Sequence, residues 1–189
     1  MKKVLVIDNY DSFTYNLVYL LKQFKGVKVD VIRNDKVDLD ALSGYDKLLF
    51  SPGPGVPQEA GMMCGIIKAY AATKPMLGVC LGHQAIGEVF GSKLKNLTQV
   101  FHGIATDIFV KIDEGIFRAV PKTFKAGRYH SWVIDEINIS EELEVTAIDE
   151  NNLIMAVAHK KYDIQGVQFH PESILTEHSA IMMGNWINK

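Results

Sequence analysis

The chain has 189 residues, of which 48% are apolar and 22% are charged, a composition typical of an ordinary globular protein. Its 20 basic and 22 acidic side chains leave a net charge of −2, so there is no electrostatic reason to expect binding to nucleic acid or to an anionic membrane. No apolar run approaches the roughly 20 residues of a membrane-spanning helix, and the short run after Lys3 lacks a signal-peptide cleavage site, so we expect one cytoplasmic domain over residues 1–189.

Short apolar runs alternate with helical patterns in the first half of the chain. The predicted strands are residues 3–8, 27–32, 47–50 and 76–79. One predicted helix begins near Asp11, and two others cover residues 60–72 and 82–90. The first run is apolar throughout, as expected of a strand that is buried on both faces. Strand–helix alternation of this kind implies right-handed crossovers and a parallel sheet.

The second half of the chain has a different rhythm. Its predicted strands have shorter connections and cover residues 104–112, 124–128, 143–148, 154–159 and 166–169, before a final helix over 179–187. Such spacing favours antiparallel pairing. The predicted fold class is therefore α/β, a mainly parallel doubly wound sheet with helices on both faces and a smaller antiparallel layer from the second half.

A cysteine at the junction of a predicted strand and helix is the first candidate for chemistry. Cys80 has Gly78 and Gly82 on either side, which is the G-x-nucleophile-x-G pattern of a nucleophile elbow. The turn needs glycines because neighbouring chain segments approach too closely for a Cβ atom, and it tends to strain the nucleophile's backbone. The helix N-terminus favours a thiolate, and the N–H of Leu81 is free to stabilise an oxyanion. The alternative is a buried structural cysteine, which is the interpretation that suits Cys64.

A histidine followed by an acid provides a candidate base. His170, Pro171 and Glu172 follow an apolar strand, and residues two apart in extended chain project to the same side. Glu172 can therefore orient the imidazole of His170, which would accept and return a proton of the cysteine. By itself, His-Pro-Glu is more typical of a strand end at the surface. The hypothesis depends on contact between side chains 90 positions apart.

A second glycine loop, Ser51-Pro52-Gly53-Pro54-Gly55, follows the third predicted strand. It should emerge beside Cys80, because ligands bind at the carboxyl ends of parallel strands. Proline stiffens the loop while glycine exposes N–H groups, so we expect Gly53 to supply a second oxyanion donor, with Pro54 and Gly55 beside the substrate. The loop lacks the Gly-Lys-Ser/Thr of a phosphate-binding loop. Its alternative role is a rigid connection.

These segments closely resemble the class I, or triad-type, glutamine amidotransferases over almost the whole chain. The segments that carry the resemblance are Asp8–Leu17, Ser51–Gly55, Gly78–Gln84, Arg128–Ser131 and Phe169–Ser173. They look equally like the amidotransferase components of anthranilate synthase and of aminodeoxychorismate synthase.

The resemblance implies a set of site residues. Cys80, His170 and Glu172 would form the triad, and the residues that hold glutamine would be Gly53, Gly55, Gln84, Ser131 and Trp132, the last two largely through the backbone. Position 132 departs from the family pattern, which usually has leucine there. A backbone contact should tolerate this change, although the pocket wall would differ.

The resemblance also implies a reaction and a partner. Cys80 would attack the side-chain amide of L-glutamine and form a thioester, with no metal or organic cofactor needed. The ammonia would pass to a large chorismate-binding synthase subunit, since 189 residues leave no second domain to use it. We favour anthranilate synthase, with aminodeoxychorismate synthase or a shared role as the alternative.

Two other functions fit the same pattern. One is a stand-alone thiol hydrolase of γ-glutamyl compounds, which would need no partner. The other is a regulatory subunit that has lost catalysis. The presence of all three triad residue types, Gln84 and both glycine loops argues against the second.

Overall fold

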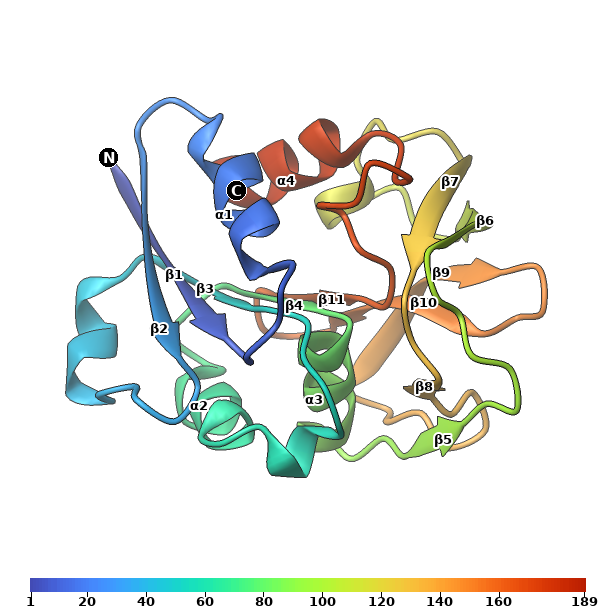
Figure 1. The fold of residues 1–189 in the computed structure, drawn as a ribbon, viewed down its shortest axis with the longest axis horizontal. Coiled ribbons are helices and arrows are strands. Elements are labelled where there is room, and N and C mark those ends of the chain that lie inside the picture. The colour runs from blue at the N-terminus through green and yellow to red at the C-terminus, as the bar shows by residue number, and fades with distance from the viewer.

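The computed structural model describes residues 1–189 and contains a nine-stranded mixed sheet with helices on both faces (Figure 1). The strand order is β2-β1-β3-β4-β11-β10-β9-β6-β7. The first five strands in this order are parallel to their neighbours. They are β2 (Val27–Arg33), β1 (Lys2–Asp8), β3 (Lys47–Phe50), β4 (Met76–Val79) and β11 (Ile164–Val167).

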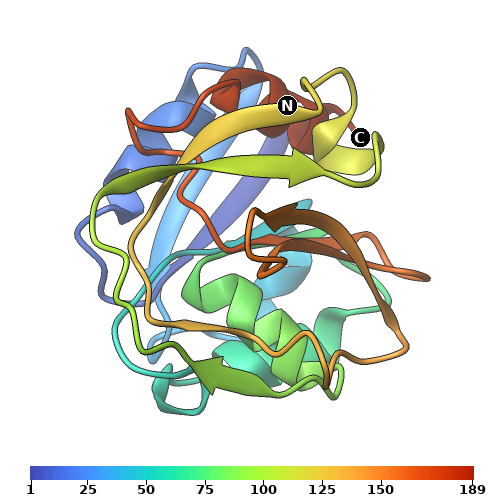
Figure 2. The ribbon, with the colours of Figure 1, turned by 90° about the vertical axis from the view of Figure 1, so that its right-hand side faces the viewer.

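Antiparallel pairing extends this sheet on the side of β11. The antiparallel strands are β10 (Ile154–His159), β9 (Leu143–Asp149), β6 (Ile104–Val110) and β7 (Thr123–Arg128). A separate antiparallel sheet contains β5 (Leu94–Asn96) and β8 (Trp132–Ile134). In Figure 2, β5 runs beneath α3 (Leu81–Val89), with which it makes contact.

The two faces of the sheet are covered by different helices. α1 (Thr14–Lys22) and α4 (Ser179–Asn188) lie on one face, and α2 (Met63–Tyr70) and α3 lie on the other (Figure 1). The alternation of a strand explains why one segment contributes to both cores: in β1, Val4 and Val6 pack toward the first face while Leu5 and Ile7 pack toward the second. All four are fully buried, each worth roughly 1.5–3 kcal/mol of burial free energy.

The predicted fold class is confirmed, with several differences in detail. The helix predicted over residues 60–72 is shorter, covering Met63–Tyr70 after a 3-10 turn at Pro57–Glu59. β5 and β8 were not predicted, because three-residue strands are too short to show a periodicity. Most strands of the second half extend the main sheet, and only β5 and β8 form a sheet of their own. Because both halves of the chain share one sheet, we infer one folding unit.

The parallel strands bring the candidate site together at one edge. Gly78 pairs with both Phe50 and Gly166, so the segments after β3, β4 and β11 leave the sheet side by side. These segments contain the glycine loop, Cys80 and the stretch that leads to His170. None of the helices combines the length and apolarity needed to cross a membrane, and no group of three or more His, Cys, Asp or Glu side chains is arranged to hold a metal ion.

Candidate active site

Cys80 occupies a strained turn between β4 and α3. Its φ of 52° and ψ of −100° lie in a region that side-chain-bearing residues rarely adopt. The backbone on both sides holds it there: its N–H donates to Val167 O at 2.8 Å, and its carbonyl accepts from Gln84 N at 3.0 Å. The side chain is 6% exposed. This strained elbow presents the sulfur at the first turn of a helix, where a thiolate is favoured.

The two glycines beside Cys80 are required by close backbone contacts. A Cβ added to Gly78 would lie 2.4 Å from the carbonyl carbon and oxygen of Gly82. One added to Gly82 would lie 2.6 Å from Phe50 O. Both distances are far inside van der Waals contact, which confirms the expectation that this turn leaves no room for a Cβ.

His170 and Glu172 form a buried pair beside the sulfur. His170 Nδ1 is 2.7 Å from Glu172 Oε1, and the two side chains are 2% and 0% exposed. The carboxylate can only accept, so Nδ1 carries a proton and Nε2 is left for Cys80. Nε2 has no well-aligned hydrogen-bonding partner, yet the cysteine side chain is close enough to interact with the imidazole. The structure therefore brings close together two side chains that lie 90 positions apart in sequence.

The electrostatics of this group favour a charged imidazole. Burial alone would lower the pKa of His170, but hydrogen bonding and charge from Cys80 and Glu172 outweigh burial and raise the pKa to about 10. An imidazolium with this pKa stays protonated at neutral pH and stabilises negative charge on the neighbouring sulfur. The three side chains can therefore supply a nucleophile, a proton donor and an orienting carboxylate.

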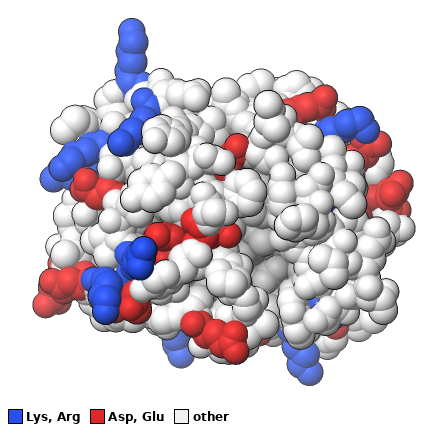
Figure 3. Space-filling view, viewed as in Figure 1, with Lys and Arg blue, Asp and Glu red and all other residues white.

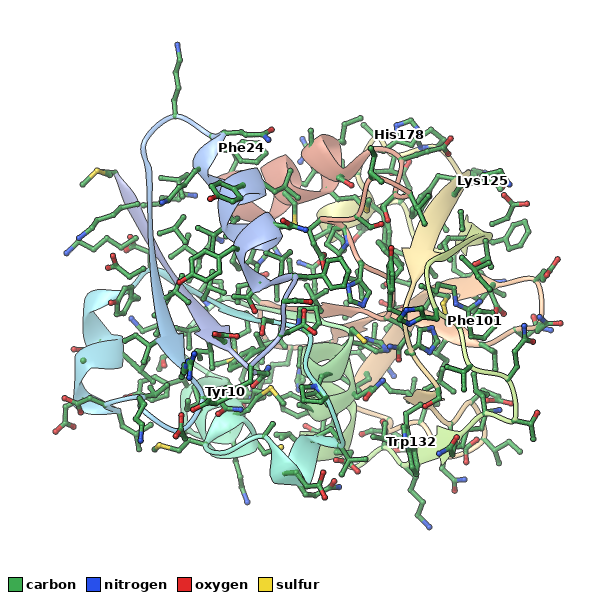
Figure 4. All side chains as sticks on the ribbon, viewed as in Figure 1. Tyr10, Phe24, Phe101, Lys125, Trp132 and His178 are labelled. Atoms are coloured by element: carbon green, nitrogen blue, oxygen red, sulfur yellow. The ribbon has the colours of Figure 1, made fainter.

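The sulfur opens into a small cavity of about 190 Å³. Its lining includes five residues expected from the sequence to hold substrate, namely Gly53, Gly55, Gln84, Ser131 and Trp132. Figure 3 shows a hollow near the centre of the face that is seen in Figure 1. In Figure 4, Trp132 and Phe101 lie to the right of the centre, in the region of β8. A larger hollow of about 550 Å³ borders Glu172 but excludes Cys80, so we assign the chemistry to the smaller one.

The remaining expected residues are placed differently. Pro54 and Leu81 border another hollow, of about 330 Å³, whose lining does not include Cys80. The N–H groups of Gly53 and Leu81 donate to no backbone carbonyl, and Gly53 lies so close to Leu81 that an added Cβ would be 2.7 Å from the leucine Cδ2. Backbone pairing therefore leaves both N–H groups available as oxyanion donors.

A buried ion pair supports the far wall of the cavity. Arg128 Nη1 donates to Asp149 Oδ2 at 2.7 Å, with both side chains at most 1% exposed. The guanidinium carbon lies 3.6 Å from the ring centroid of Phe101, and Arg128 Nε donates to His130 Nε2 at 3.1 Å. Burial, together with the positive charges of Arg128 and His170, lowers the pKa of His130 to about 3. The His130 ring is therefore neutral and serves as a fixed part of the wall.

Comparison with known proteins decides the family. The family model described as Glutamine amidotransferase class-I matches residues 5–189. The chain belongs to the class I glutamine amidotransferases. The resemblance drawn from the motifs is thereby confirmed, and with it the expectation that the protein is an enzyme of this kind.

Relatives of this amidotransferase include two named synthase components. Anthranilate synthase component 2 of Cyanophora paradoxa is 46% identical over 188 residues, which cover 98% of each chain. Aminodeoxychorismate synthase component 2 of Escherichia coli K12 is 42% identical over 189 residues, covering 98% of this chain and 100% of that protein. A crystal structure from Thermoplasma acidophilum, of a protein provisionally described as a GMP synthase subunit, has a TM-score of 0.89 and 28% identity and covers 100% of this chain and 93% of its own.

One residue beside the sulfur of this amidotransferase was not predicted from the sequence. Gln168 is fully buried, and its Nε2 lies 3.6 Å from Cys80 Sγ. The signal was present, because Gln168 and His170 are two positions apart and extended chain directs such residues to the same side. Only the paired strands β4 and β11 show that this side faces the sulfur.

The His170–Glu172 pair predicts a change in the pH dependence of the amidotransferase. Glu172→Gln removes a negative charge that raises the pKa of His170, so the imidazolium will lose its proton at lower pH. We expect the alkaline limb of the kcat/KM profile for glutamine to move down by about one pH unit or more. Glu142→Gln is the matched control, since Glu142 lies 3.6 Å from His159 in a second Glu–His pair outside the cavity. An unshifted alkaline limb in Glu172→Gln would contradict the assignment.

Proposed function

We propose that this amidotransferase hydrolyses L-glutamine through Cys80, His170 and Glu172 and delivers ammonia to a chorismate-using synthase subunit. The observation that carries the proposal is the strained cysteine, presented at a helix N-terminus beside a buried His–Glu pair. The proposed location is the cytoplasm, which the two free cysteines support.

The first half-reaction forms a thioester. The Cys80 thiolate attacks the side-chain amide carbon of glutamine, a C–S bond forms, and the carbonyl electrons move to oxygen. The N–H groups of Leu81 and Gly53 stabilise this oxyanion. When the carbonyl re-forms, the C–N bond breaks, and the departing nitrogen takes a proton from the His170 imidazolium and leaves as ammonia.

The second half-reaction restores the thiol site. Neutral His170 removes a proton from water, which attacks the thioester carbon. The new tetrahedral oxyanion uses the same two N–H groups. Its collapse breaks the C–S bond and releases glutamate, leaving thiolate and imidazolium as at the start. Glu172 holds the ring in position and stabilises its charged form in both steps.

The surface around the cavity supports docking of a synthase subunit. Exposed apolar side chains border each of the three hollows described above. Tyr19 and Ile174 border the hollow beside Glu172, Tyr10 borders the hollow beside Pro54, and Val100 borders the Cys80 cavity. Ile174 is 100% exposed, with no neighbour that covers it. Figure 3 shows that the area to the right of the centre of this face is mostly uncharged. Exposed apolar clusters of this kind are typical of protein–protein contacts.

We propose anthranilate synthase as the complex, with aminodeoxychorismate synthase as the alternative. The Cyanophora relative is 46% identical and the Escherichia coli relative 42%, so identity favours the first by a small margin. The test combines the purified chain with each type of large subunit, glutamine and chorismate. An ortho-aminated product would support the anthranilate branch, and a para-aminated product the other; formation of both would indicate a shared subunit.

The same experiment separates the proposal from a stand-alone hydrolase. An amidotransferase subunit should release glutamate weakly when alone and faster with its synthase partner. A stand-alone enzyme should instead cleave γ-glutamyl peptides at a rate that no partner changes. Failure to release glutamate with either large subunit, from protein whose Cys80 reacts with a glutamine-like electrophile, would contradict the proposed function.

A further inference from the structure

A chain of buried and half-buried hydrogen bonds leads from the cavity wall to the Cys80 sulfur. His130 Nδ1 lies 3.1 Å from Trp132 O, and Gln84 Nε2 donates to the same carbonyl at 2.9 Å. Gln84 Nε2 also donates to Gln168 Oε1 at 3.2 Å, and Gln168 Nε2 lies 3.6 Å from Cys80 Sγ. The mechanism described above uses neither Gln168 nor its contact with the sulfur.

The directions of these bonds follow from groups that can only donate or only accept. A guanidinium cannot accept, so Arg128 donates to His130 Nε2, and the proton of the neutral ring is on Nδ1, which donates to Trp132 O. Since Trp132 O is a carbonyl, it can only accept, so Gln84 must present its NH₂ group there. Rotating that amide by 180° would set two oxygens 2.9 Å apart.

The same constraint orients the next amide. Because Gln84 uses the same nitrogen toward Gln168, the group of Gln168 that faces it must be the oxygen. The opposite orientation would bring two NH₂ groups to 3.2 Å and would turn a carbonyl oxygen toward the sulfur. Gln168 therefore directs an N–H donor at Cys80 Sγ.

We propose that Gln168 is a further catalytic residue, which stabilises the Cys80 thiolate through its side-chain N–H and is held in that orientation by Gln84 and the Trp132 carbonyl. This inference rests on the proposed role of Cys80 as nucleophile. A donor to an anion is worth more than one to a neutral atom. The bond therefore strengthens the resting thiolate and weakens once the sulfur becomes a neutral thioester. Gln168 transfers no atom, and its amide regains a charged acceptor when the thiolate is released.

Two variants of Gln168 test the role of the N–H. Gln168→Leu removes the donor at similar volume. Gln168→Glu keeps an oxygen for Gln84 to donate to, and replaces only the group that faces the sulfur. The readout is the rate of Cys80 alkylation by iodoacetamide across pH, followed on the peptide that contains Cys80 so that Cys64 does not contribute.

We expect the pH midpoint of alkylation to lie about one unit higher in the leucine variant, so that alkylation at pH values below this midpoint is about tenfold slower. The glutamate variant should be slower still, because a carboxylate would repel the thiolate. In the glutaminase assay with the synthase partner, kcat should fall with little change in KM. The other titratable groups around the sulfur are His170 with Glu172, and His130, His102 and Tyr129 of the cavity lining, and all of them are unaltered in both variants.

Gln165→Leu is the matched control. Gln165 is a buried glutamine of β11, three positions before Gln168, and its Oε1 accepts from Ile116 N at 2.9 Å instead of facing the cysteine. Its loss should leave Cys80 alkylation unchanged. If Gln168→Leu does not fold, the isosteric glutamate variant decides the question.

Wild-type alkylation profiles in both Gln168 variants would overturn this inference while leaving the proposed function intact. Absence of glutaminase activity in the wild-type protein with its partner would instead overturn the proposed function. A fall in stability without a change in alkylation would show that Gln168 is only structural.

Discussion

Cys80→Ser is expected to reduce glutamine-dependent synthesis by roughly 10³-fold or more, while free ammonia still supports the partner subunit. A serine hydroxyl is far less acidic than a thiol, so the imidazolium of His170 cannot hold it as an anion. The fold should tolerate the change because the two side chains differ by one atom. The measurement is product formation by the assembled complex with glutamine and, separately, with ammonium salt.

The second cysteine provides the control for this experiment. Cys64→Ser changes a half-buried thiol that donates to Pro57 O at 3.6 Å and does not line the Cys80 cavity. Burial raises the pKa of Cys64, which keeps it protonated. We expect both activities to persist in this variant. If Cys80→Ser instead loses the ammonia-dependent activity as well, Cys80 is structural.

Gly78→Ala is expected to lower the free energy of unfolding by about 3 kcal/mol or more. The added methyl would lie 2.4 Å from backbone atoms of Gly82, and 2.7 Å from His83 N, where no side-chain rotation can relieve the overlap. β4 and α3 must then separate, which also displaces Cys80. Thermal unfolding should show a midpoint lower by roughly 6–12 °C for a chain of this length.

Gly65→Ala is the corresponding control in an open position. Gly65 is an exposed residue within α2, and an added Cβ would meet nothing within 4 Å. Alanine should stabilise the helix by about 0.5–1 kcal/mol, because glycine is the more flexible residue in the unfolded chain. Equal effects of the two substitutions would mean that the elbow tolerates a side chain, contrary to the contacts at Gly78.

Local sequence patterns predicted the elements that carry the site. The apolar run of β4 followed by Gly78, Cys80 and Gly82 indicated a strand, a sharp turn and a helix, because each of these has a strong local signature. The antiparallel strands β5 and β8 had no such signature. Neither did the shortening of α2, in which residues 60–62 form a turn between the 3-10 segment Pro57–Glu59 and the helix.

The position of the wall residues could not be predicted from local patterns. Ser131 and Trp132 line the cavity because β8 pairs with β5 beneath α3, and Arg128 supports them through an ion pair with Asp149, 21 positions away. Pairing between distant segments depends on total burial over the whole fold. Pro54 and Leu81 border another hollow for the same reason.

The amino-acid sequence alone determined the class of fold, the strained elbow and the chemical identities of the thiol, imidazole and carboxylate, because these depend on residue types and short spacings. The tertiary structure decided that Val79 and Val167 pair in neighbouring strands, which brings His170 to the sulfur and turns Gln168 toward it. The physical reason is that strand order is selected by the joint burial of two apolar faces, a property of the whole sheet that no single segment encodes.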